Sequence, residues 1–298
     1  MQINIFENGI YLDLEITEDK DVRLLHLGAI KRKPRENTEC YKDYRLVEVH
    51  EAGMNQDAHS GSKHIGSCPG YLLKYHTHRD YRNEFGRKLE IVQEYEGLYV
   101  TSHIQFFDQI SVIRSWTEIK NESKDNHPIE YITSFALTGI SDTAFGPRDK
   151  GVIMHIPHST WYGEAQWKSY TLNELGYDVV NTFSVKRISL ASTGSWPASE
   201  YLPMGSYENI NSNSTITWQI ETTGSWFWEL SDVSETLYLN ISGPTFQENS
   251  FLKILKPNES FTTIQCAVSF VNGDFQASIR ELTKYRRRIR RKNKDNEN

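Results

Sequence analysis

The sequence predicts a mainly β protein, one large two-sheet sandwich that is followed by a single C-terminal helix. Three observations favour this fold class. Phe, Trp and Tyr make up 12% of the 298 residues, and aromatic side chains are enriched in strands. Short segments that alternate between apolar and polar residues, separated by turn residues, occupy most of the chain. Only one segment, close to the C-terminus, has helical periodicity.

The first group of predicted strands begins with a hairpin at Asn8-Gly9, because Asn-Gly is the strongest short hairpin signal. A polar, glycine-containing loop over 51–70 interrupts the group, and four long strands follow it. The predicted strands are Gln2–Phe6, Tyr11–Ile16, Val22–Leu27, Arg45–His50, Tyr71–Tyr81, Lys88–Tyr95, Leu98–Phe107 and Ser111–Lys120. Strands of about ten residues indicate a wide, twisted sheet rather than a compact barrel.

A second group of strands follows without a Pro- or Ser-rich linker. We therefore expect one sandwich over residues 1–272 rather than two domains. The predicted strands of this group are Ile129–Thr138, Val152–Pro157, Glu164–Tyr170, Phe183–Leu190, Ser214–Glu221, Ser225–Leu230, Glu235–Ile241 and Thr262–Val271.

The periodicity changes over residues 273–298. Phe275, Ile279, Leu282 and Ile289 have helical spacing, which predicts an amphipathic helix from about Asp274, its N-cap, to about Arg291. From Lys284 onward the net charge is +6, so the rest of the chain carries −12. Basic residues suit the C-terminal half of a helix. The basic tail is either a solvated helix face that leads to a further domain or a nucleic-acid contact.

Composition and the first residues exclude several classes of protein. No run of about 18 apolar residues occurs, so the sequence predicts no membrane-spanning helix and no membrane partner. The start, MQINIFENGIYLDLEI, lacks the basic and apolar regions of a signal peptide. Cys40, Cys68 and Cys266 form neither a disulfide framework nor a zinc motif. We therefore expect a reduced, cytoplasmic protein.

No self-contained set of catalytic residues stands out. There is no G-x-S-x-G, no H-E-x-x-H, and no Walker A or G-x-G-x-x-G between a strand and a helix. The chain holds 39 acidic residues, too many to single out the carboxylate pair of a glycosidase. The pairs His76/His78 and His155/His158 have no third ligand nearby in the sequence. We expect no catalytic residue, no metal and no cofactor in this chain.

The polar loop 53–70, GMNQDAHSGSKHIGSCPG, is the first candidate binding segment. Loops on a rigid sheet are where binding residues concentrate. Its donors and acceptors suit a hydroxyl-rich ligand, and they are Asn55, Gln56, Asp57, His59, Lys63 and His64. The alternative is a solvated hairpin loop without a ligand.

Trp196 is the second candidate, within the segment Gly194-Ser195-Trp196-Pro197. This indole lies outside any strand alternation and between turn residues, which favours its display at the surface. The C–H faces of sugar rings stack on indole rings, so an exposed Trp beside a polar loop is typical of carbohydrate sites. The alternative is a core Trp beneath a loop.

Four stretches of the sequence carry a resemblance to a known family. They are LVEVHEAGMNQDAHSGSKHIGSCPGYLLKYHTHRDYRNEFGRKLEIV (46–92), VIRSWTEIKNES (112–123), SLASTGSWPASEYLPMG (189–205) and LKPNESFTTIQCAVSFVNGDF (255–275). Together they cover most of the length of the chain, and the first is long and specific. In these stretches the sequence resembles the N-terminal domain of the bacterial α-galactosidases of glycoside hydrolase family 36.

The resemblance implies a β-supersandwich, with a catalytic (β/α)8 barrel after the terminal helix. Such a barrel needs about 250 residues, so the family's nucleophile and acid/base carboxylates match no residue of this chain. The resemblance also implies that loops 55–57 and 194–196 reach the active-site mouth of a neighbouring subunit in tetrameric members. There Asp57 would accept hydrogen bonds from sugar hydroxyls, and Trp196 would form a wall of the pocket.

The preferred function is therefore that of a non-catalytic N-terminal domain of a retaining α-galactosidase that acts on raffinose- or melibiose-type α-galactosides. The domain would brace its own barrel, support a homo-oligomer and complete the substrate pocket of a neighbour. A stand-alone carbohydrate-binding module is one alternative, and it would bind galactosides by itself. A nucleic-acid binder that uses the basic tail is another, and its affinity would fall steeply with salt.

Overall fold

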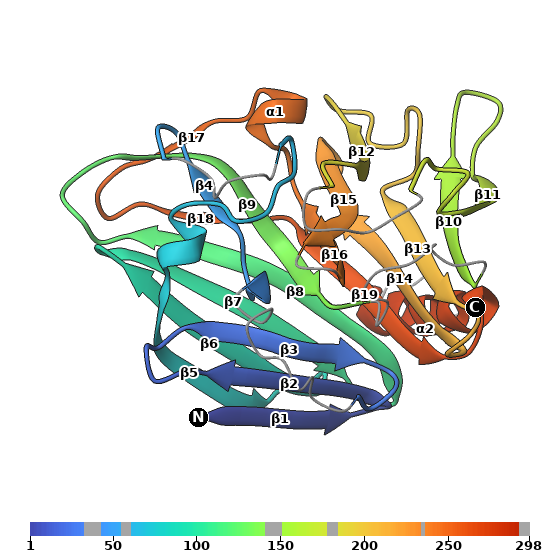
Figure 1. Cartoon of the computed structure of the whole chain (residues 1–298), viewed down its shortest axis with the longest axis horizontal. Coiled ribbons are helices and arrows are strands. Elements are labelled where there is room, and N and C mark those ends of the chain that lie inside the picture. Colours follow the sequence, from blue (N-terminus) through green and yellow to red (C-terminus); the bar gives the residue numbers. More distant parts are fainter. Residues whose placement is uncertain (33–42, 55–60, 141–150, 178–183, 234–235, 292–298) are drawn as a thin grey trace.

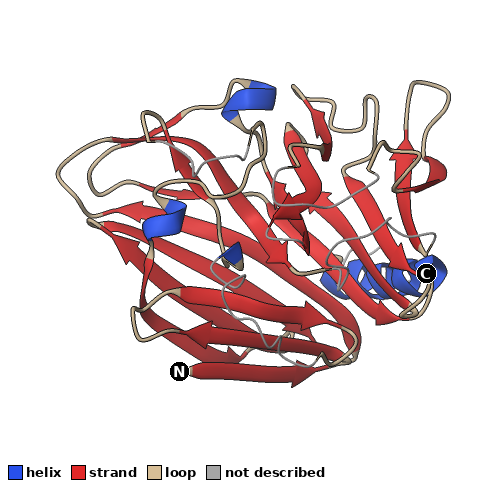
Figure 2. Ribbon diagram, viewed as in Figure 1, coloured by secondary structure: helices blue, strands red, loops and turns tan. Residues whose placement is uncertain are grey.

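The computed structural model describes residues 1–32, 43–54, 61–140, 151–177, 184–233 and 236–291. Strands make up most of this part of the chain, and they form three antiparallel sheets (Figures 1 and 2). The long C-terminal helix α2 lies against the outside of the largest sheet. The predicted fold class, mainly β with a C-terminal helix, is confirmed.

The largest sheet has ten strands in the order β11-β10-β13-β14-β19-β8-β7-β6-β5, with the short β18 paired to β8. Its strands are β5 (Lys74–Arg82), β6 (Arg87–Tyr95), β7 (Leu98–Phe107), β8 (Ile110–Asn121), β10 (Val152–His158), β11 (Gln166–Thr171), β13 (Met204–Asn209), β14 (Ser214–Glu221), β18 (Ser260–Thr262) and β19 (Gln265–Asn272). Strands from both halves of the sequence pair here, because β19 lies between β14 and β8. This pairing joins the two predicted groups into one body.

The second large sheet has six strands in the order β12-β15-β16-β9-β17, with β4 also paired to β9. Its strands are β4 (Val49–Glu51), β9 (His127–Thr138), β12 (Arg187–Ser192), β15 (Trp226–Val233), β16 (Thr236–Ser242) and β17 (Lys253–Leu255). The short helix α1 (Phe246–Asn249) follows β16 at the edge of this sheet (Figure 1).

A third sheet is formed by β1 (Gln2–Glu7), β2 (Ile10–Ile16) and β3 (Val22–Gly28). The β1–β2 turn is Asn8-Gly9, as predicted, and both residues have positive φ, at 52° and 84°. Such a left-handed pair, a type I′ turn, matches the twist of the two strands in a two-residue hairpin. Two large sheets were predicted, and this three-stranded sheet is an addition to them.

The main core lies where the sheets face each other. Trp218 on β14 meets Trp228 on β15 edge to face, with ring centroids 5.0 Å apart, and both rings are fully buried. Leu12 and Leu14 of β2 belong to the same buried cluster as Leu89 of β6. Burial of large apolar side chains is the dominant favourable term in folding. One continuous core therefore connects all three sheets.

Helix α2 (Phe275–Ile289) packs its apolar face on β8, β14 and β19. Leu282 and Tyr285 are buried against Phe107 and Val112 of the sheet. The predicted N-cap is confirmed, since the carboxylate of Asp274 accepts a hydrogen bond of 2.8 Å from the N–H of Ala277.

Several strand limits differ from the prediction. Strand β5, for example, begins at Lys74 rather than Tyr71, because Gly70–Leu72 forms a 3-10 turn. The segment 45–50 contains strand only from Val49, in β4. The structure also forms β13 at Met204–Asn209, where no strand was predicted. Its sequence, MGSYEN, shows no clean alternation, because five of the eight residues from Gly205 to Ser212 are Gly, Ser or Asn. The pairing partners β10 and β14 hold this strand in place.

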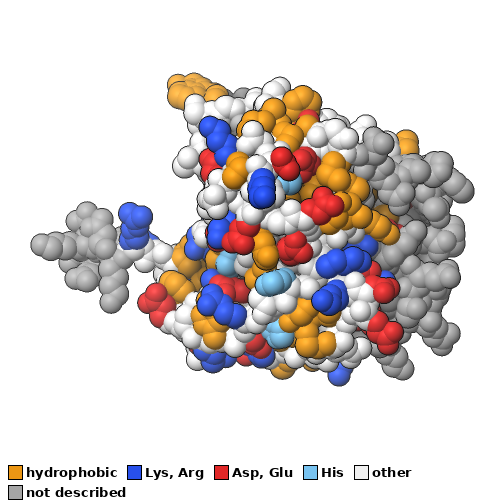
Figure 3. Space-filling model, turned by 90° about the vertical axis from the view of Figure 1, so that its left-hand side faces the viewer, with side chains coloured by type: hydrophobic (Ala, Val, Ile, Leu, Met, Phe, Trp, Pro, Cys, Tyr) orange, Lys and Arg blue, Asp and Glu red, His pale blue; other side chains and the backbone are white. Residues whose placement is uncertain are grey.

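Basic and acidic side chains intermingle on the face of the molecule in Figure 3, with histidines among them. On the described outer strands, Glu90 accepts from Arg79 and lies 2.7 Å from the amine of Lys88. Charged side chains of both signs therefore lie next to one another on these strands. Among the described helices, none combines the length and the apolar character that a membrane crossing needs.

Candidate functional site

The polar loop after β4 is described only at its two ends. Asn55, Gln56, Asp57 and His59 lie outside the described residues, so their predicted contacts with sugar remain predictions. At the start of the loop, the N–H of Met54 donates to the carbonyl of Glu51 at 3.1 Å. At its end, Lys63 and His64 are buried in the six-stranded sheet.

Lys63 anchors the loop through a buried ion pair. Its side chain is only 4% exposed, and the amine donates to the carbonyls of Ser184 and Asp232 at 2.6 and 2.8 Å. The amine also lies 2.5 Å from the carboxylate of Asp232. These three acceptors use the three donors of an ammonium group. Lys63 therefore holds the loop to the sheet rather than presenting its amine to a ligand.

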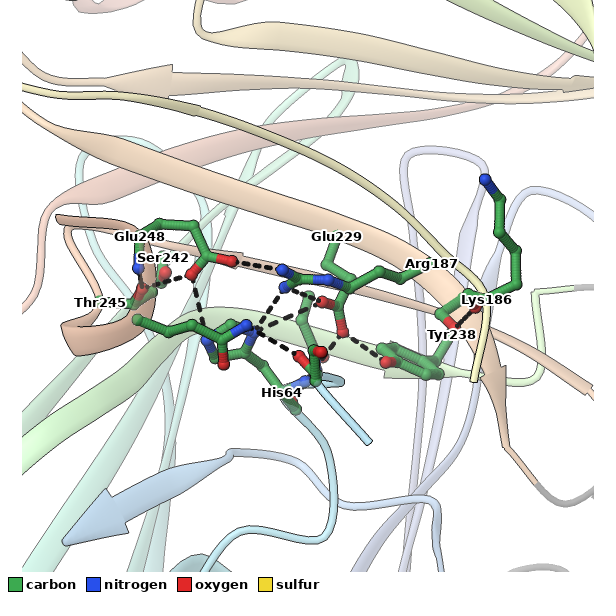
Figure 4. A network of polar contacts seen from close by, with 12 residues as sticks. His64, Lys186, Arg187, Glu229, Tyr238, Ser242, Thr245 and Glu248 are labelled. Atoms are coloured by element: carbon green, nitrogen blue, oxygen red, sulfur yellow. Dashed lines mark hydrogen bonds and ion pairs between the residues drawn. The ribbon is translucent and has the colours of Figure 1, made fainter. Parts of the chain in front are cut away.

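His64 lies at the centre of a polar network, shown in Figure 4. Its backbone N–H donates to Glu229 at 2.9 Å, and its Nδ1 lies 3.3 Å from the same carboxylate. Arg187 bridges two acids, with Nη1 3.1 Å from Glu229 and Nη2 2.7 Å from Glu248. Tyr238 donates its hydroxyl proton to Glu229. The network joins β12, β15 and β16 to α1 and to the end of the polar loop.

Glu229 remains ionised inside this network although it is completely buried. Burial alone would raise the pKa of its carboxyl group, but the hydrogen bonds and charge of His64 and the hydrogen bond of Tyr238 together lower that pKa below its usual value. A buried carboxylate with so many donors is a fixed structural anion. The network therefore sets the position of His64 rigidly.

A cavity of about 300 Å³ opens beside His64. Its lining comes from β4, β9, α1 and the two ends of the polar loop, and it consists of His50, Met54, His64, Glu130, Tyr131, Phe246 and Gln247. Burial lowers the pKa of His50, whose Nε2 lies 3.4 Å from Glu130. Neutral imidazole and carboxylate groups offer both donors and acceptors to a polar ligand. The volume reaches the lower end of the range for small-molecule pockets.

His50 and Glu130 were not predicted as site residues, because they lie on strands far apart in the sequence and come together only when β4 pairs with β9. Among the described residues, no three side chains of His, Cys, Asp or Glu group closely enough to hold a metal ion.

The histidine pairs that could have supplied metal ligands have structural partners instead. A bulge at His76 interrupts β5, so His76 and His78 do not continue a regular alternation. His78 lies 2.7 Å from the hydroxyl of Tyr75. His155 lies between Ser169 and Glu208, and His158 lies 2.8 Å from the hydroxyl of Tyr170.

Trp196 is displayed at the surface, 48% exposed, in the loop between β12 and β13. Its carbonyl accepts from the hydroxyl of Ser192 at 3.1 Å, and the next carbonyl, of Pro197, accepts from the indole of Trp226 at 2.6 Å. The expectation of a displayed Trp is thus confirmed, whereas its contact with a sugar stays a prediction. The structure also places Trp161 beside it, with ring centroids 5.8 Å apart.

Helix α1 connects the two candidate regions. Gln247 lines the cavity and lies within 3.5 Å of the carbonyl of Ser62 in the polar loop. Asn249 donates to the carbonyl of Ser192, the residue that also holds Trp196. The polar loop and the Trp196 segment, far apart in the sequence, therefore lie at the same edge of the molecule, around α1.

Comparison with known proteins gives similarity of structure only. No family model matches the sequence, and no curated protein matches it. The GH36 α-galactosidase AgaB from Geobacillus stearothermophilus is similar over 97% of this chain and 42% of its own, with a TM-score of 0.76 and 15% identity. A variant of AgaA from the same organism, in complex with raffinose, is similar over 98% of this chain and 44% of its own. Its TM-score is 0.71 and its sequence identity 14%. The chain thus spans less than half the length of these enzymes.

A smaller protein has a related fold. A putative aldose 1-epimerase from Escherichia coli is similar over 91% of this chain and 99% of its own, with a TM-score of 0.51 and 10% identity. In the α-galactosidases the matching part is the N-terminal part, about 42% of the chain. The chain therefore has the fold of the N-terminal domain of the family 36 α-galactosidases.

Proposed function

We propose that this chain acts as the non-catalytic N-terminal domain of an α-galactosidase for raffinose- or melibiose-type galactosides. The observation that carries the proposal is the extent of the structural match, which takes in 97% of this chain but only 42% of AgaB. The domain braces a catalytic barrel against the face that bears α2, and it contributes to a sugar pocket in a homo-oligomer. Asp57 and Trp196 are its proposed sugar contacts, with Asn55, Gln56 and His59 beside them.

The position of the candidate loops supports this role. Trp196 and the ends of the polar loop lie at one edge, around α1, where a second subunit can reach both. A displayed indole and a polar loop together match what a galactoside offers, a C–H face and several hydroxyl groups. Two fixed anchors, the Lys63 ion pair and the Glu229 network, hold these loops in place.

The proposal is tested by activity with and without the barrel. The purified chain is expected to release no p-nitrophenol from p-nitrophenyl α-galactoside. We expect the coding sequence past Asn298 to continue into a segment of repeating βα units, and the longer product to hydrolyse both this substrate and raffinose. In the longer product, Asp57→Ala should raise KM for raffinose. Turnover by the purified chain alone, abolished by Asp57→Ala, would contradict a non-catalytic role.

A stand-alone carbohydrate-binding module is the second candidate. The E. coli protein favours it, since nearly all of that chain matches nearly all of this one, so the fold does not need a barrel. Calorimetric titration with raffinose separates the candidates. A module predicts substantial affinity in the present chain, whereas a domain that completes a neighbour's pocket predicts very weak binding without the barrel.

A further inference from the structure

Three exposed aromatic side chains form a surface feature that the sequence analysis recognised only in part. Trp161 and Tyr162, in the loop between β10 and β11, are 66% and 91% exposed. Trp161 meets Trp196 edge to face, with an interplanar angle of 83°. We call Trp161, Tyr162 and Trp196 the aromatic corner. In such a pair the edge of one indole meets one face of the other, so the remaining indole faces are not covered by the partner ring.

The backbone holds this corner open. Tyr162 has a φ of +62°, a left-handed conformation that bulky residues rarely adopt. The turn around it is closed by two hydrogen bonds between the backbones of Thr160 and Gly163, at 3.2 and 3.0 Å. The N–H of Ser159 donates to the carbonyl of Glu200 at 2.8 Å, which ties this hairpin to the Trp196 loop. The backbone that carries the aromatic residues is thus organised before any ligand arrives, which lowers the entropic cost of binding.

Polar residues accompany the aromatic residues along the chain. Glu164, Ser195 and Glu200 are exposed on the same two loops, and the Glu164 carboxylate accepts from the N–H of Tyr162 at 3.3 Å. An apolar protein surface would leave these carboxylates without partners on contact, at a cost in free energy. A sugar satisfies both features, because its hydroxyls donate to carboxylates while its C–H face covers an indole.

We propose that the aromatic corner is a sugar-stacking site of this chain, in which Trp161 and Trp196 contact one galactoside and Tyr162 borders it. Galactose suits the corner chemically, because its axial 4-hydroxyl leaves the C–H groups of carbons 3, 4 and 5 together on one face. The inference deepens the proposed function, on which the identity of the sugar rests. It adds Trp161 and Tyr162 to the sugar contacts, and it assigns weak binding to the chain without its barrel.

The test follows the indole N–H signals of the 15N-labelled chain while raffinose is added. Trp161→Phe and Trp196→Phe assign the two signals of the corner. Both signals are expected to shift with one common Kd in the millimolar range, about −4 kcal/mol, while those of the buried Trp218 and Trp228 stay in place. Absence of shifts at the corner up to about ten times that concentration would overturn the proposal.

Variants test whether stacking on the aromatic corner accounts for the affinity for raffinose. Trp161→Ala is expected to weaken binding about fivefold or more, as loss of about 1 kcal/mol of aromatic contact requires. Phe6→Ala is the control, since it removes a 59% exposed ring from β1, at the opposite end of the molecule. Unchanged indole signals of Trp218 and Trp228 confirm that each variant folds. Equal affinity of Trp161→Ala and the parent chain would contradict the proposal.

Three further outcomes keep this inference distinct from the proposed function. If the corner signals shift with protein concentration and not with raffinose, the corner is a contact between copies of the chain and the proposal is wrong. If raffinose binds at the corner but the longer product has no galactosidase activity, the sugar site stands and the proposed function fails. If the longer product is active while raffinose leaves the corner unchanged, only the sugar site fails.

Discussion

The role of Lys63 could not be predicted from the composition of the loop that contains it. In the sequence it stands in a polar loop among candidate sugar-binding residues, but in the structure it is among the most buried charged side chains described. Its partner Asp232 lies 169 positions further along the chain, so no local pattern connects them. Trp196 shows the opposite case, since its neighbours Gly, Ser and Pro did indicate display. Local sequence thus indicated the exposure of Trp196 but not the burial of Lys63, because that burial depends on a partner far away in the sequence.

Replacement of Lys63 tests the buried ion pair. Lys63→Ala is expected to lower the free energy of unfolding by about 3–5 kcal/mol, because it leaves the carboxylate of Asp232 buried and uncompensated. Lys168→Ala removes an exposed Lys and should change stability by less than about 0.5 kcal/mol. Urea unfolding followed by Trp fluorescence measures both. Similar values for the two variants would mean that Lys63 is not in the ion pair.

Glu48 is expected to make stability depend on pH. Burial raises the pKa of its carboxyl group to about 7, against the opposing effect of hydrogen bonds from Ser67 and the charge of Arg45. The folded protein therefore binds a proton more tightly than the unfolded chain, whose pKa is near 4.5. The contribution of Glu48 to stability is thus lost as the pH rises from about 4.5 to about 7.

The variant Glu48→Gln checks this dependence. Its amide oxygen can still accept the hydrogen bonds of Ser67, and it carries no charge at any pH. Relative to the parent chain, the variant should gain up to about 3 kcal/mol of stability between pH 4 and pH 8. Glu18→Gln, at an exposed position, should leave the profile of the parent unchanged. A constant difference between Glu48→Gln and the parent across this range would argue against a raised pKa.

Among the helices and strands, regular periodicity was sufficient to predict the limits of elements that bury only one face. The β1–β2 hairpin and helix α2 begin and end within two residues of their predicted limits. Strand β13 was missed because Gly205 and its polar neighbours give no alternation, and pairing with β10 and β14 overrides that weak propensity. The bulge at His76 in β5 could not be foreseen either, since it depends on the register of β6.

The N-cap of helix α2 can be tested by substitution of Asp274. Asp274→Ala is expected to lower the free energy of unfolding by about 1 kcal/mol, because the N–H of Ala277 loses its acceptor. Asp274→Asn keeps a side-chain oxygen at the same place and should retain most of that stability. Thermal unfolding by circular dichroism compares the two variants with the parent. Equal losses for Ala and Asn would show that the carboxylate charge, rather than the cap geometry, stabilises the helix.

For the whole molecule, the close packing of the two large sheets is the decisive feature. Gly205 on β13 lies opposite Trp218 on β14, and a Cβ atom added there would be 2.3 Å from the indole. Trp218 in turn meets Trp228 of the second sheet. The fully buried indole has little room to move, so the space beneath it admits only glycine.

Gly205→Ala is therefore expected to destabilise the protein by about 1–3 kcal/mol through overpacking. Gly224→Ala serves as the matched control, because an added Cβ there would be 3.7 Å from its nearest neighbour. Thermal melts of the two variants and the parent give the comparison. If Gly205→Ala melts at the temperature of the parent, the indole of Trp218 is not held as closely as the structure indicates.

The sequence by itself determined the fold class, most of the strands, the terminal helix and the resemblance to the family 36 α-galactosidases. These follow from periodicity, turn residues and local motifs, all of which act over a few neighbouring residues. Only the tertiary structure decided which side chains meet. The pairing of β4 with β9 brings His50 to Glu130, the buried network fixes His64, and two separate loops bring Trp161 to Trp196. Such contacts depend on strand order and register, which many sequences with the same local pattern could satisfy in other ways.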